Sequence, residues 1–163
     1  MYKFPSMYMK SCHEKLFWFS ASSSNNSEPF QSVNSQVVSF DQTLEQYGDC
    51  CFGSFFNNTF TSKKKGKYKF DSIVSVISTP IISPFTGSIT LSLRKNGTLV
   101  TSITQAFNVN SPATQTLNLC LNHCLFLCQC QNVDITVSTS ISSGTGSFQV
   151  VGSRTFSGTL CSE

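Results

Sequence analysis

The chain has 163 residues, of which 39% are hydrophobic and only 12% charged, with 15 Phe and a formal net charge of +3. This length suits one domain with a substantial core and a short extension. The small net charge does not predict a nucleic-acid-binding surface, and no apolar run approaches the ~18 residues of a membrane span. Serine, threonine and asparagine between aromatic residues favour many short strands joined by polar turns.

Residues 1–30 differ in composition from the rest of the chain. Aromatic residues and methionines are frequent up to residue 19, and a polar stretch follows at 20–27. We interpret residues 1–30 as an arm that docks outside its own domain, so the domain proper covers residues 31–163. The apolar residues expected to contact a neighbouring subunit are Phe4, Tyr8, Phe17, Trp18 and Phe19. The alternative is that the segment folds back over its own domain.

Apolar and polar residues alternate along several segments of the domain, which predicts strands. We expect residues 36–41 to open the fold, and 89–93 and 132–138 to follow as strands. Asn96-Gly97 predicts a tight hairpin turn, because both central positions of a type I′ turn need positive φ. In residues 117–130 leucines occupy one parity and cysteines the other, which predicts a strand buried on both faces.

Three segments resemble landmarks of a known family. Residues 60–70 hold a Phe-x-x-x-x-x-Gly-x-Tyr-x-Phe frame, residues 91–97 end in Lys-Asn-Gly, and residues 154–161 resemble a closing Ser-x-Phe-Ser-Gly-x-Leu strand. In this order they resemble the globular head of complement subcomponent q, a relative of the tumour necrosis factor jelly rolls. The resemblance implies an antiparallel jelly-roll β-sandwich of about eight to ten strands. It also implies a homotrimer, with Tyr68 and Phe70 at the threefold interface.

We expect no enzyme and no cofactor. The two histidines lack the spacing of a zinc helix, no Gly-x-Ser-x-Gly elbow occurs, and the carboxylates are scattered. The single metal candidate is a cluster in the cysteine-rich segment: Cys120, His123, Cys124, Cys128 and Cys130. Ligands projecting from one strand would be spread along it, whereas zinc needs four ligands at tetrahedral angles. We therefore predict disulfides or packed thiols rather than a metal site.

Five lysines between residues 63 and 69 form the densest positive charge in the chain. They could bind anionic glycans or lipid head groups. The simpler interpretation, which we favour, is a solvated strand edge where lysines prevent unwanted pairing.

The function is expected to be structural or binding, and two classes compete. The first is a surface or structural component of a large assembly, such as a virion capsid or spore coat, with a receptor- or glycan-binding role; its partners are its own copies and neighbouring structural subunits. The lack of a secretory signal and of a collagen-like stalk favours this class. The second is a secreted complement-like or cytokine-like ligand. The eight cysteines and the sequons at Asn25, Asn57 and Asn96 favour the second class.

Overall fold

The computed structural model describes residues 17–31, 35–47 and 53–162. Its elements are all strands: β1 (Trp18–Ser23), β2 (Gln36–Val37), β3 (Gln42–Tyr47), β4 (Gly53–Phe56), β5 (Thr59–Ser62), β6 (Gly66–Lys95), β7 (Thr98–Val109), β8 (Gln115–Leu127) and β9 (Asn132–Ser162). Every ladder between them is antiparallel. The described part contains no helix long and apolar enough to cross a membrane.

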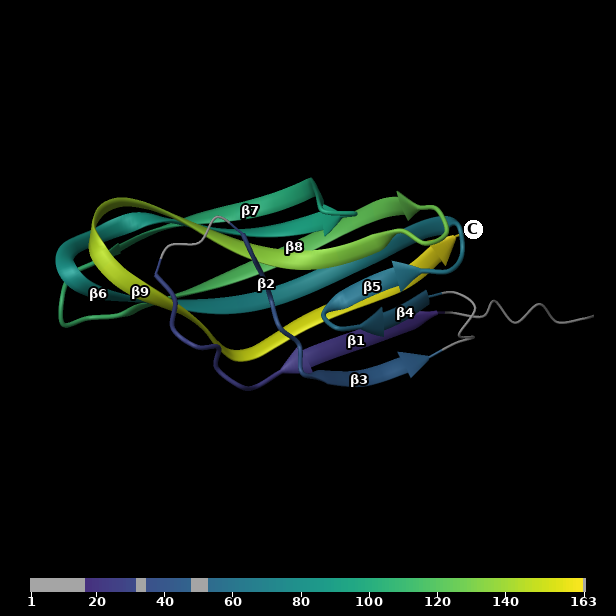
Figure 1. The fold of residues 1–163 in the computed structure, drawn as a ribbon, viewed down its shortest axis with the longest axis horizontal. Coiled ribbons are helices and arrows are strands. Elements are labelled where there is room, and N and C mark those ends of the chain that lie inside the picture. The colour runs from purple at the N-terminus through teal and green to yellow at the C-terminus, as the bar shows by residue number, and fades with distance from the viewer. Residues whose placement is uncertain (1–16, 32–34, 48–52, 163) are drawn as a thin grey trace, which may run out of the picture.

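The two long strands, β6 and β9, each run through two layers. The first half of β6 pairs with β8 and with the end of β9, whereas its second half pairs with β7 and with the start of β9. Figure 1 shows β6 and β9 bending at the end of the molecule opposite the C-terminus. The first sheet therefore has the order β3, β1, β9, β6, β8, and the second has the order β4, β5, β9, β6, β7. This arrangement is a jelly-roll sandwich and confirms the predicted fold class.

The β6–β7 hairpin forms as the sequence predicts. Asn96 and Gly97 both have positive φ, at 49° and 76°, which is the requirement of a type I′ turn. The right-handed twist of such a turn matches that of the strands it joins, so the two halves of the hairpin pair from Lys95 and Thr98 onwards.

The core between the sheets contains two aromatic groups. In the first, the Phe19 ring centroid lies 4.9 Å from that of Phe60 and 5.3 Å from that of Phe156. In the second, Phe148 lies 5.3 Å from both Phe85 and Phe107. Buried aromatic pairs at these distances stabilise the fold beyond their burial alone.

Strand β1 corrects the predicted domain boundary. It pairs with β3 on one side and with β9 on the other, so it is an inner strand of the first sheet. Phe17 and Phe19 have no exposed surface. The prediction that these two phenylalanines dock outside their own domain is wrong, and so is the boundary at residue 30. Phe4 and Tyr8 lie outside the described residues.

The physical reason for this error is the composition of the strand. Burial alternates along Trp18–Ser23, with Phe19, Ala21 and Ser23 pointing inward and the partly buried Trp18 pointing outward. Small serines on the outer side of a strand look like a linker when they are read without their partner strands. The predicted strand 36–41 is reduced to the two-residue strand β2, and the first strand of the described residues is β1.

Candidate functional site

Tyr68 and Phe70 lie inside the sandwich. Neither has any exposed surface in the single chain. The Tyr68 ring lies 5.5 Å from Phe60 and the Phe70 ring 5.8 Å from Phe156. The Tyr68 hydroxyl donates a hydrogen bond to the Lys64 carbonyl at 2.9 Å. A side chain without exposed surface cannot contact a second chain, so the prediction that these two residues form a trimer interface is wrong.

The outward positions of the same strand form a different surface. Along β6 they alternate with the buried aromatics, and they pair across to outward residues of β8. Ile73 lies opposite Cys120, Asp71 opposite Asn122, Lys69 opposite Cys124 and Lys67 opposite Phe126. We call these eight residues the contact face. Ile73 and Phe126 are the large apolar side chains in it, 48% and 49% exposed.

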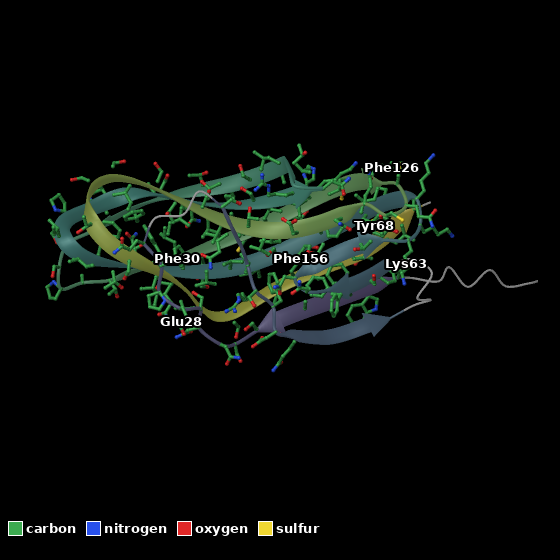
Figure 2. The ribbon with its side chains drawn as sticks, in the orientation of Figure 1. Glu28, Phe30, Lys63, Tyr68, Phe126 and Phe156 are labelled. Carbon is green, nitrogen blue, oxygen red and sulfur yellow. The ribbon has the colours of Figure 1, made fainter. Side chains whose placement is uncertain are left out.

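Charged and polar groups lie between Ile73 and Phe126, which are at opposite ends of the contact face. Lys69 Nζ lies 3.6 Å from Asp71 Oδ2, and Asn122 donates a hydrogen bond to the other oxygen of Asp71. Lys65 Nζ lies 5.5 Å from the centroid of the Phe126 ring, a cation–π distance. Figure 2 shows Lys63, Tyr68 and Phe126 at one end of the sandwich.

The lysines of β6 do not lie on the edge strand that the sequence analysis expected. Lys67 and Lys69 lie on β6, which is flanked by β8 and β9. The edge strand of the first sheet is β8, and side chains from the second sheet protect two of its carbonyls. Gln105 donates to the Asn118 carbonyl at 3.1 Å, and Lys95 donates to the Phe126 carbonyl at 3.3 Å.

The cysteines of β8 point to solvent, so the prediction of a strand buried on both faces is wrong. Leu117, Leu119 and Leu121 face the core, whereas Cys120 and Cys124 are exposed. The first sheet has the core on one side only, and this leaves the cysteine side open. The described cysteines are all free and exposed: Cys120, Cys124, Cys128, Cys130 and Cys161. The other three, Cys12, Cys50 and Cys51, lie outside the described residues.

The metal candidate is divided between two faces of β8. His123 has the parity of the buried leucines and is half-buried, on the side opposite Cys120 and Cys124. Within the described part of the chain, no three potential ligand side chains gather closely enough to hold a metal ion. Alternation along a strand is the physical reason, because adjacent positions of a Cys-x-x-His-Cys pattern cannot converge there.

A buried arginine that the sequence analysis did not identify holds the N-terminal segments to β9. Arg154 is 3% exposed, and it donates from Nε to the Ser39 carbonyl and from Nη1 to the Asn25 carbonyl, both at 2.5 Å. Burial lowers the pKa of Arg154, and nearby Asp41 opposes that shift. Hydrogen bonding from Ser23, and to a lesser extent from Asn25, lowers the pKa of Asp41. We interpret this group as structural.

Ile73 is the contact-face residue that the sequence reasoning missed. It shares its parity with Lys67 and Lys69 rather than with Tyr68 and Phe70. That parity is the signal that places an isoleucine among exposed charges.

No family model matches the chain, and no curated protein matches it. Among solved structures, the chain is similar to the globular domain of zebrafish complement 1qA protein, with 16% sequence identity, 90% of this chain and 96% of that chain covered, and a TM-score of 0.48. The strand pairings given above, and not this similarity, establish the jelly-roll sandwich.

Proposed function

We propose that this chain is a trimeric structural or surface component of a large particle, such as a virion capsid or a spore coat, with a glycan- or receptor-binding role. In this proposal the copies associate through the contact face. The chain contributes shape and contacts rather than catalysis.

The observation that carries the proposal is the exposure of Ile73 on a central strand of the first sheet. Large apolar side chains exposed on an open sheet face can mark a contact with another molecule. Phe126 lies on the adjacent strand at the other end of the contact face, and the polar pairs Asp71–Asn122 and Lys69–Cys124 between the two apolar residues offer hydrogen-bonding groups to a partner.

The state of the cysteines supports the particle over the secreted ligand. Five described thiols are exposed and unpaired, and exposed thiols seldom persist in the oxidising environment of secreted proteins. Thiol titration in denaturant discriminates between the two classes. Eight reactive thiols per chain favour the particle component, whereas a protein with most cysteines in disulfides favours the secreted ligand.

Sedimentation equilibrium tests the trimer and its surface together. We expect the natural sequence to sediment as an oligomer of three chains at micromolar concentration. Ile73→Lys places a charge in the contact face and should yield monomers. Ile81→Lys is the matched control, because Ile81 is 66% exposed at the bend of β6, outside the contact face. A stable monomer of the natural sequence, or a trimer that survives Ile73→Lys, contradicts the proposal.

The segment before β1 is proposed to connect each trimer to neighbouring structural subunits, through Phe4 and Tyr8. The test removes residues 1–16 only, because β1 begins at Trp18 and belongs to the core. The truncated protein should keep its melting temperature and lose incorporation into particles. Normal incorporation of the truncated protein contradicts this role.

A further inference from the structure

The end of the sandwich opposite the C-terminus is formed by the bends of the two long strands and by the turn between β7 and β8. At this end β6 and β9 both bend (Figure 1), and their bends lie side by side because Ile82 pairs with Thr145. The turn joins them, since the Ser111 amide donates a hydrogen bond to the Ser83 hydroxyl at 2.7 Å. We call these segments together the tip: residues 79–86, 110–114 and 141–146.

Ile81 and Ile82 project from the tip into solvent. They are 66% and 59% exposed, and no other two adjacent large apolar residues in the described part of the chain are both exposed. Consecutive side chains of a regular strand face opposite sides. Here the β6–β9 ladder shifts register on both sides of Ile82, so both isoleucines lie on the outside of the bend. Each would gain free energy from being covered by apolar material.

The backbone that carries the two isoleucines is held in place by the neighbouring segments of the tip. Gly144 of β9 lies against the carbonyl groups of Ile82 and Pro84, so closely that a Cβ at this position would overlap both. The hydrogen bond between Ser111 and Ser83 is a second attachment of the same bend. A partner therefore meets a surface that is already formed, and no loop has to be ordered when it binds.

The tip contains no charged residue. Asp, Glu, Lys and Arg are absent from all of its segments. The densest positive charge, at residues 63–69, lies at the other end of the sandwich, where Figure 2 shows Lys63. Because moving a charge out of water is costly, the tip can enter an apolar environment at a much lower cost than the lysine-rich end. The complementary partner is one without net charge.

The exposed apolar area distinguishes between a protein and a lipid partner. A stable protein interface buries about 800 Å² on each side, and a pair of isoleucines supplies only a minor part of such an area. A lipid surface requires no such area, because a few apolar side chains that reach below the head groups already gain free energy there. We propose that the tip binds the surface of an electrically neutral phospholipid bilayer, with Ile81 and Ile82 inserted beneath the head groups. This role goes beyond the proposed function and does not depend on the contact face.

Flotation of the full chain with lipid vesicles tests the proposal. The probe is a vesicle of phosphatidylcholine, which carries no net charge, and the comparator is a vesicle that also contains phosphatidylserine. The protein should bind to phosphatidylcholine alone, and this binding should persist in about 1 M salt, where charge interactions are screened beyond about 3 Å. Ile81→Lys and Ile82→Lys should each weaken binding about tenfold or more, since each removes a large apolar side chain from the contact and adds a charge.

Leu99→Lys is the matched control. Leu99 is an aliphatic residue of similar exposure, 57%, but it pairs with Arg94 at the other end of the sandwich, and its substitution should change binding by less than about twofold. Ile81→Trp gives a second readout, because its fluorescence should shift to shorter wavelength on phosphatidylcholine and should be quenched by nitroxide-labelled lipid. Trp18, which pairs with Thr159 near the C-terminus, should show neither change in the natural sequence.

The proposal is overturned if no binding to phosphatidylcholine occurs at about 10 mM lipid, about a hundredfold more than a single acyl chain requires. Binding that needs phosphatidylserine, or that survives both lysine substitutions in the tip, also overturns it. Sedimentation of Ile81→Lys without vesicles separates a lipid partner from a second copy of the chain. The variant should sediment as the natural sequence does, and a smaller oligomer would assign the tip to contacts between copies instead.

Discussion

The two outer faces of the sandwich differ although one core lies beneath both. The first sheet presents Ile73, Phe126 and the thiols Cys120 and Cys124. The second sheet presents hydroxyl groups at outward positions, such as Ser92 and Thr104, and an exposed apolar residue, Leu99, beside a small pocket at one end that Arg94 helps to line. Hydroxyl-rich strands remain hydrated, whereas half-exposed apolar side chains gain from being covered. In the proposed function, the first face contacts other copies of the chain and the second face stays in solvent.

The largest expected effect comes from the core beneath the first sheet. Gly158 lies opposite Phe19 and Phe70 in the ladders, and a Cβ there would lie 2.3 Å from Phe19 Cε1 and 2.9 Å from Phe70 Cε1. Gly158→Val should therefore lower the free energy of unfolding by about 1–3 kcal/mol through overpacking. Denaturant titration measures it. Thr155→Val, an outward-facing change on the same strand, should have little effect, and an equal loss in both variants would refute the assigned register.

A smaller effect is expected at the arginine that anchors the N-terminal segments. Arg154→Met leaves the carbonyls of Ser39 and Asn25 without their donor, and such a loss costs about 1–2 kcal/mol. Arg154 lies on β9, a strand that belongs to both sheets. We therefore expect the variant to unfold in a single transition at a lower melting temperature. Calorimetry measures the transition, and an unchanged melting temperature would show that this anchor is dispensable.

The smallest effects concern how the free energy of unfolding depends on pH. Asp41 and Asp134 should contribute to it with opposite signs. The pKa of Asp41 is lowered, so its contribution to stability is present above the ordinary value of 3.8 and is lost as the pH falls through the folded-state pKa. Burial raises the pKa of Asp134, against the opposing effect of Arg94, so its contribution is present below 3.8 and is lost as the pH rises through the folded-state pKa.

At neutral pH, Asp41→Asn should therefore lower the melting temperature and Asp134→Asn should raise it. Both differences should shrink below pH 4. Melting curves between pH 3 and pH 7, in about half-unit steps, measure the two trends. Two differences of the same sign at neutral pH would contradict the assigned environments.

The sequence predicted the fold better than the site, for identifiable physical reasons. Alternation and the Asn96-Gly97 turn depend on neighbouring residues, so a single strand or hairpin can be recognised from its own residues. The side of a strand that faces the core depends on the partner sheet. The interface role of Tyr68 and Phe70 came from the family resemblance, and the sequence alone does not show that their side of the strand faces the core.

Long-range pairing explains the remaining errors. β1 is a strand because β3 and β9 lie on both sides of it, and no local signal in its serine-rich sequence reports those partners. The Arg94–Asp134 pair depends on the register of β6 against β9, two strands whose paired positions are 40 residues apart here. Arg154 was missed for the same reason, because its acceptors are backbone carbonyls that carry no sequence signature.

Thiol labelling of the native protein tests the contact face most directly. The sample is treated with N-ethylmaleimide at a concentration where it is associated, and the modified cysteines are identified by mass spectrometry. We expect Cys120 and Cys124 to be protected and Cys130, in the turn after β8, to react rapidly; Ile73→Lys should restore the reactivity of the first two. If Cys120 and Cys124 react as rapidly as Cys130 in the associated protein, the first sheet is not the surface through which the copies meet.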